Sequence, residues 1–240
     1  MEFAPWRRLR SFVKSSDDDF SCYESQCGAA HVRVALTGVG GARAKKLARQ
    51  ALVWQPSICI SAGLAGSLSK EHRRGDVIVA RNIVELESGR TVMADHDLLK
   101  HAESCGSATI QRMITSSSMI LSAEGKRRLG NMGEAVEMES FEVASEAADR
   151  GIPAIAIRAI SDEVDEDLPI DFSRVLDEKG SVDKSEVIRS LAKAPHKLPA
   201  LVRLGSHSRA ASAKLAEFLE RYVSTLVGAE SAEIVGAERA

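Results

Sequence analysis

The chain has 240 residues, of which 44% are hydrophobic and 28% are charged, and its formal net charge at pH 7 is -2. These values are typical of a globular protein with a core of ordinary size. With 32 basic and 34 acidic residues, the chain has no charge excess for nucleic acid, and no apolar run reaches the ~18 residues of a membrane span or forms a signal peptide. We therefore expect a cytoplasmic protein with no nucleic-acid partner and no membrane span.

Strand and helix patterns alternate along the first half of the chain. Residues 31–37 alternate apolar and polar side chains, run into Gly38-Val39-Gly40-Gly41, and lead to a helical stretch at 42–53. A second strand, nearly all apolar, is expected at 57–62 and ends in Gly63-Leu64-Ala65-Gly66. Three elements follow: strands at 76–80 and 109–115 and a helix at 122–129.

The second half begins with a helix at 138–150, which ends before Gly151, and an apolar strand at 154–160 that only Arg158 interrupts. Three more helices are expected, at 172–178, 184–193 and 197–226. This order predicts an α/β fold, a single-domain three-layer sandwich whose mostly parallel central mixed sheet is flanked by helices. We expect the domain to span 1–227 and residues 228–240 to form a disordered tail.

Two glycine clusters follow predicted strands. The turn at Gly38–Gly41 opens a helix, where backbone N–H groups can hold an anion, but it lacks the third glycine and the later acidic residue of a dinucleotide site. The cluster at Ser61–Gly66 lies where open parallel sheets bind ligands. Its small residues permit either close approach of a ligand or close helix packing.

A guanidinium inside an apolar strand is costly unless it is paired. Arg158 therefore predicts a nearby carboxylate, and Asp162 or Glu139 is the expected partner. Glu139 also begins a helix, where the helix dipole favours a carboxylate in any case.

The cysteines and histidines form no metal-binding pattern. None of the four cysteines belongs to a C-x-x-C pair, and His96 and His101 are off the i, i+4 spacing of a helix. We expect no metal, and a reducing compartment in which Cys59 is a core residue.

Four segments in order resemble the nucleoside phosphorylase superfamily, closest to its methylthioadenosine/S-adenosylhomocysteine nucleosidase branch. They are Ser61-Ala62-Gly63, Gly75–Val79, Val136–Ser140 and Arg158–Asp162, and the resemblance extends from residue 2 to about 165. It implies an N-glycosidase, a nucleosidase that releases adenine from a purine nucleoside such as methylthioadenosine or S-adenosylhomocysteine. It also implies a homodimer or larger homo-oligomer.

The resemblance gives each matching residue a role. Asp162 would protonate the purine N7, because breaking the bond produces a cationic sugar and the leaving base must be neutralised. Glu139 would accept hydrogen bonds from the ribose 2′ and 3′ hydroxyls, with Met138 beside the sugar or base. The other substrate-binding positions would be Glu137, Ser61, Ala62, Gly63, Met119, Ile120, Ser161 and Arg158. Met119 and Ile120 are equally consistent with a place in the core.

The amino terminus departs from the family pattern. The family opens with a central strand and then a glutamate that activates the attacking water. Here Glu2 takes the place of that glutamate and the first strand is missing, so we expect the true start of the gene to lie upstream. Glu2 is then either the catalytic base or a disordered end residue.

Whether water or phosphate is the nucleophile depends on whether arginines are placed to bind phosphate. Hexameric phosphorylases of the superfamily carry an arginine three residues before the serine of the glycine cluster, and here that residue is Ile58. We therefore expect water as the nucleophile and no cofactor, with phosphate as co-substrate only if the enzyme is a phosphorylase. Four arginines could supply a phosphate site by another route: Arg7, Arg8, Arg33 and Arg43.

Two alternatives stay open. Leu168-Pro169 and residues 193–201 resemble the hopanoid-biosynthesis-associated subgroup, which releases adenine from an adenosylated lipid and would need an apolar channel for it. A catalytically silent nucleoside-binding protein is the other alternative, although a binder has no need of the proton donor Asp162.

Overall fold

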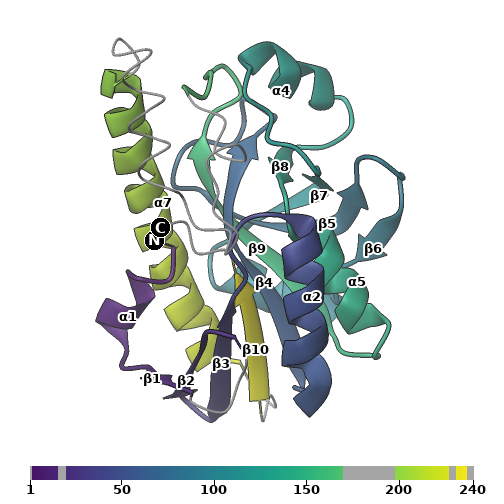
Figure 1. The fold of residues 1–240 in the computed structure, drawn as a ribbon, viewed down its shortest axis with the longest axis vertical. Helices are drawn as coiled ribbons and strands as arrows, with labels where there is room; N and C mark the ends of the chain where they lie inside the picture. The colour runs from purple at the N-terminus through teal and green to yellow at the C-terminus, as the bar shows by residue number, and fades with distance from the viewer. Residues whose placement is uncertain (1, 16–19, 170–197, 227–230, 237–240) are drawn as a thin grey trace.

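The computed structural model describes residues 2–15, 20–169, 198–226 and 231–236. In this part of the chain a mixed β-sheet lies between two layers of helices (Figure 1). The predicted α/β sandwich with a mixed sheet is therefore confirmed. Within the same residues, no helix combines the length and the apolar character that a membrane crossing requires.

The strands are β1 (Val13–Lys14), β2 (Cys22–Cys27), β3 (Ala30–Leu36), β4 (Ile58–Ser67), β5 (Val77–Glu85), β6 (Thr91–Met93), β7 (Ala108–Thr115), β8 (Ala135–Glu137), β9 (Ala154–Asp162) and β10 (Ser231–Gly236). The helices are α1 (Trp6–Leu9), α2 (Gly41–Ala51), α3 (His96–Ser104), α4 (Ala123–Leu129), α5 (Ser140–Ala148) and α7 (Leu198–Ser224), with a short 3-10 helix at Leu52–Trp54. The helices predicted at 172–178 and 184–193 lie outside the described residues.

The strand order is β1-β2-β3-β10-β4-β8-β7-β5-β6, and β9 pairs with both β4 and β5. The pairing of β9 with β4 is parallel and its pairing with β5 is antiparallel. Strands β4, β8, β7, β5 and β9 therefore close a ring within the sheet. Its register sets Gly63 opposite Arg158, and Gly66 opposite Asp162.

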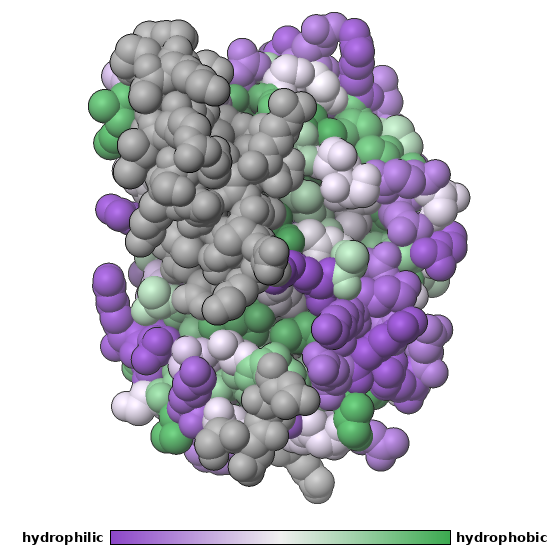
Figure 2. Space-filling view, in the orientation of Figure 1, coloured by the Kyte–Doolittle hydropathy of each residue, from purple (hydrophilic) through white to green (hydrophobic). Residues whose placement is uncertain are grey.

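Helices cover both faces of the sheet because each presents an apolar stripe to it. On one face α7 packs with α3 and buries the predicted stripe that contains Leu215, Phe218 and Tyr222. On the other face α2 and α5 pack against the sheet and against each other. The outer side of α2, with Lys46 and Arg49, forms a hydrophilic surface (Figure 2).

Strand β10 overturns the expectation of a disordered tail for residues 231–236. It lies between β3 and β4 and is parallel to both, with Ile234 opposite Val34 and Ile60. Ile234 and Val235 are 2% and 1% exposed, so they belong to the core. The domain thus continues past residue 227. A late strand also fills the central position that the sequence suggested was empty, and it satisfies the backbone groups of β3 and β4.

Strand β4 is longer than predicted. It runs through the glycine cluster to Ser67 instead of ending at residue 62, and Cys59 within it is buried, as predicted. Because the cluster lies inside the strand, its missing side chains leave room for groups from neighbouring segments.

Candidate active site

Seven predicted site residues are polar and lie buried on or beside β4, β8 and β9. None is more than 7% exposed: Glu2, Ser61, Glu137, Glu139, Arg158, Ser161 and Asp162. Burying charge at this density is unfavourable unless the groups are paired and hydrogen-bonded. Their partners therefore define the site.

Arg158 pairs with Glu137, and not with Asp162 or Glu139 as expected. The Arg158 Nη2 lies 2.7 Å from Glu137 Oε2 and donates to Ser61 Oγ at 3.1 Å. The expected partners are engaged elsewhere: Asp162 contacts Lys126, and Glu139 accepts from the Gly40 N–H. Burial alone would raise the pKa of the Glu137 carboxyl, but the Arg158 guanidinium and the donated hydrogen bonds outweigh it and hold that pKa below its ordinary value.

Glu137 also fixes the start of α5. Its Oε2 accepts from the backbone N–H groups of Glu139 at 3.0 Å and Ser140 at 2.8 Å, and its Oε1 accepts from the Thr115 hydroxyl. These protein donors surround the carboxylate. The predicted contact of Glu137 with substrate stays a prediction, and the structure adds a role in holding Arg158 and α5 in place.

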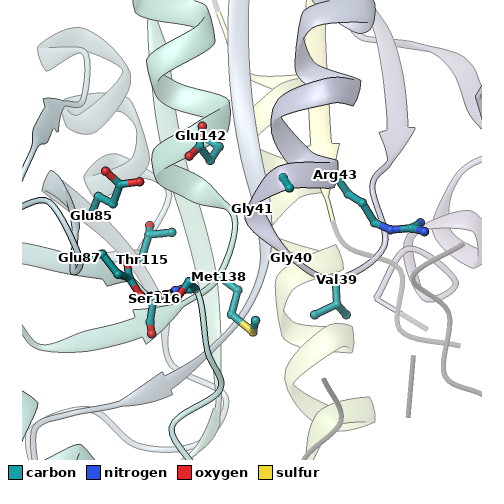
Figure 3. Close-up of a pocket in the computed structure, with 12 residues that line it drawn as sticks. Val39, Gly40, Gly41, Arg43, Glu85, Glu87, Thr115, Ser116, Met138 and Glu142 are labelled. Carbon is teal, nitrogen blue, oxygen red and sulfur yellow. Dashed lines mark hydrogen bonds between the residues drawn. The ribbon is translucent and has the colours of Figure 1, made fainter. Parts of the chain in front are cut away.

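The first glycine turn is tied to the site through Glu139. Gly40 has φ 109°, a conformation that favours glycine, and its N–H donates to Glu139 Oε1 at 2.8 Å. A cavity of about 370 Å³ opens beside this turn. Figure 3 shows Met138 reaching into it between Ser116 and Val39. Met138 therefore lines this cavity, and Glu139 is hydrogen-bonded to the turn that borders it.

Asp162 lines a second, smaller cavity of about 40 Å³. Met119 and Ile120 line it too, and so does Met138, which is shared by both cavities. The Ser161 hydroxyl donates to Asp162 Oδ1 at 2.7 Å. The residues predicted to lie along a purine face thus lie beside the predicted acid.

Lys126 is a residue that the sequence reasoning missed. Its Nζ lies 2.5 Å from Asp162 Oδ2, and its side chain is fully buried. The segment around it, Glu124 to Arg128, is so rich in charge that it predicts a solvated helix face. No pattern in the sequence distinguishes Lys126 from its exposed neighbours.

Glu2 lies in the site and is not a frayed end. A Cβ placed on Gly63 would lie 3.0 Å from Glu2 Oε2 and 3.3 Å from Arg158 Nη1. The space above Gly63 therefore holds both the carboxylate and the guanidinium. Ala62 and Glu2 also line a small apolar cavity together with Gly236 of β10.

The chain belongs to the phosphorylase superfamily, whose pattern it matches over residues 12–194. The prediction of an enzyme of this superfamily is confirmed at that level. In the described ranges, no group of three or more His, Cys, Asp or Glu side chains is arranged to hold a metal ion.

Individual relatives refine the comparison. The chain is 24% identical to the 5′-methylthioadenosine/S-adenosylhomocysteine nucleosidase of Exiguobacterium sp., and the match covers 77% of this chain and 90% of the relative. The fold is similar to that of the futalosine hydrolase of Helicobacter pylori, with a TM-score of 0.72, 17% identity, and coverage of 94% of this chain and 95% of the other. It is also similar to the methylthioadenosine/S-adenosylhomocysteine nucleosidase of Neisseria meningitidis in complex with methylthio-immucillin-A, with a TM-score of 0.71, 20% identity and the same coverages.

Proposed function

We propose that this protein is a nucleosidase that hydrolyses the N-glycosidic bond of an adenine nucleoside, such as methylthioadenosine or S-adenosylhomocysteine, and releases adenine. The observation that carries the proposal is the buried Asp162 carboxyl beside Met119 and Ile120, in a cavity that Met138 joins to a larger one. The base would lie on the Asp162 side of Met138. The names of the relatives support a nucleoside substrate.

The proposed reaction has two proton transfers, one from Asp162 and one to Glu2. Asp162 gives a proton to N7 as the C1′–N9 bond breaks, the bonding electrons pass to the base, and neutral adenine leaves. Water then adds to the cationic C1′, and its proton passes to Glu2. The position of Glu2 above Gly63 and beside Arg158 supports this role.

The sugar would lie between the two cavities. Glu139 Oε1 already accepts a hydrogen bond from Gly40, and a carboxylate oxygen accepts more than one, so the same group suits the ribose 2′ and 3′ hydroxyls. Met138 would pack against the sugar. Arg158 and Glu137 would hold the surrounding carboxylates and helix α5 in a fixed arrangement.

The charges around the larger cavity favour water over phosphate. Arg43 lines this cavity together with three glutamates: Glu85, Glu87 and Glu142. The hydrogen bond from Ser88 is the main reason that the pKa of Glu85 lies below its ordinary value. Glu85 is paired with Arg90 and Glu142 with Lys45, each at 2.9 Å, so the lining has no excess of positive charge to neutralise a phosphate dianion.

Two of the other three candidate arginines are engaged elsewhere. Arg33 lies over the Trp54 ring, 4.3 Å from its centroid, with its Nε 3.4 Å from Glu24. Arg7 lies 5.0 Å from the centroid of the Tyr23 ring. The hopanoid alternative needs an apolar channel for the lipid and is tested by the product analysis below. Of residues 193–201, which carry the resemblance to the hopanoid subgroup, those before Leu198 lie outside the described residues.

Product analysis tests the proposal. The purified protein is incubated with methylthioadenosine, S-adenosylhomocysteine, adenosine and adenosylhopane, with and without phosphate, and the products are separated by chromatography. We expect adenine and free sugar at rates independent of phosphate. Sugar 1-phosphate would instead establish a phosphorylase. Cleavage of adenosylhopane alone would establish the lipid substrate, and tight nucleoside binding without cleavage would establish a silent binder. Light scattering of the same sample tests the expected homo-oligomer.

A further inference from the structure

Lys126 is a buried lysine that has no role in the reaction described above. Its Nζ lies 2.5 Å from Asp162 Oδ2, 3.0 Å from the Glu163 carbonyl oxygen and 2.9 Å from the Glu166 carbonyl oxygen. An ammonium group has three hydrogens to donate, and these three acceptors use all of them. The geometry therefore fixes the nitrogen and directs one of its hydrogens at the predicted acid.

The surrounding backbone holds Lys126 in this position. The loop at 163–168, which follows β9, is tied to α4 by the Ala123 N–H, which donates to Asp167 Oδ1 at 2.7 Å, and by Arg127 Nη1, which lies 2.8 Å from Asp165 Oδ1. Lys126 lies under this loop with none of its side chain exposed. Because the loop covers the pair, the contact between Lys126 and Asp162 is shielded from water.

Among the described residues, Lys126 is the cation that directly contacts the Asp162 carboxylate. The other charged groups around the pair have partners of their own: Glu137 with Arg158 at 2.7 Å, and Glu163 and Glu166 with Arg74 at 3.7 and 2.9 Å. The charge of Lys126 therefore acts mainly on Asp162.

We propose that Lys126 is the positioning residue of the general acid, an inference that rests on the function proposed above. When Asp162 passes its proton to N7 and neutral adenine leaves, Asp162 remains as a carboxylate. The Lys126 ammonium is unchanged in this step and stabilises the negative charge as it develops. A fixed charge aimed at a developing one in a buried site is among the strongest sources of transition-state stabilisation.

The test compares Lys126→Met with Arg127→Met, the adjacent residue on α4. Arg127 ties the same loop to α4 but contacts Asp165 instead of Asp162. For Lys126→Met we expect kcat for methylthioadenosine to fall by about 10² with little change in KM. Arg127→Met should keep the wild-type kcat. Lys126→Arg, which keeps the charge, should recover most of the lost rate.

A second readout does not depend on turnover. Carbon-13 NMR of labelled aspartate follows the Asp162 carboxyl in the free protein, and Asp162→Asn assigns its signal. Lys126→Gln is a second uncharged variant. In both uncharged variants the Asp162 signal should differ from that of the wild type. If it does but the wild type cleaves no nucleoside, the proposed function is refuted and the pairing stands. A folded, uncharged variant with wild-type kcat and an unmoved signal would overturn the role of Lys126.

Discussion

Replacing Arg158 by methionine tests whether charge holds the centre of the site together. The side chains of Arg158 and Glu137 are 2% and 1% exposed, and their contact is 2.7 Å. Methionine keeps an unbranched stem and removes the guanidinium, which leaves a buried carboxylate without its cation. Such a loss costs about 3–5 kcal/mol of unfolding free energy. Because Thr115 and the N–H groups of Glu139 and Ser140 still donate to Glu137, we expect the lower end, about 3 kcal/mol.

The pH dependence of this loss has a definite sign. In the wild type the folded-state pKa of Glu137 lies below its ordinary value, so the pair stabilises the fold above the unfolded pKa of about 4.3 and loses this effect as the pH falls through the folded pKa. In Arg158→Met the effect of burial, which raises the pKa, remains and the charge of Arg158 is gone. The variant carboxyl therefore takes up a proton more readily in the folded state. The destabilisation should be largest at neutral pH and smaller near pH ~4.3.

Urea denaturation at these two pH values, followed by circular dichroism, measures the difference. The double variant Glu137→Gln with Arg158→Met is the control, because it removes the carboxylate as well as the guanidinium and should recover about 1–3 kcal/mol at neutral pH. A loss below about 1 kcal/mol, or an equal loss at both pH values, would refute the reasoning that the pair is buried and ionised.

Two further substitutions test the close approach of Gly66 to Asp162 and the burial of strand β10. Gly66→Ala would put a Cβ 2.8 Å from Asp162 Oδ2, so kcat should fall by about 10² with little change in Tm. In its control, Gly205→Ala in α7, the Cβ meets nothing within 4 Å, and the unfolding free energy should rise by about 0.5–1 kcal/mol. Ile234→Ala in β10 should cost about 2–5 kcal/mol in urea denaturation, whereas Val202→Ala, at a residue 64% exposed, should change little. If Ile234→Ala and Val202→Ala changed the unfolding free energy equally, residues 231–236 would lie outside the core.

The sequence predicted the need for a partner of Arg158 but not its identity. An arginine in an apolar strand requires a carboxylate wherever the fold supplies one. The choice of Glu137 depends on β8, a strand of three residues that pairs with β4 and β7. So short a segment has no periodicity to read, and its direction is set by the strands on either side.

Strand β10 was missed for a related reason. Residues 231–236 contain only two adjacent β-branched residues, Ile234 and Val235, which is a weak strand signal. The segment becomes a strand because β3 and β4 present unpaired edges to it. Lys126 likewise lies in a charged helix that predicts solvent exposure, and only the loop at 163–168 buries it. Long-range packing decided all three cases. The sheet elements followed from local patterns, whereas Asp162 and Glu139 were assigned through the resemblance to the superfamily.

The most direct test of the central claim is the rate of adenine release by Asp162→Asn in single-turnover experiments with methylthioadenosine. Asparagine keeps the shape of the side chain and has no acidic proton to give. We expect a folded protein, nucleoside binding close to that of the wild type, and a rate lowered by about 10²–10⁴. Its Tm should fall, because Lys126 loses the buried anion that it contacts. Release of adenine at the wild-type rate by the folded variant would contradict the assignment of Asp162 as the general acid.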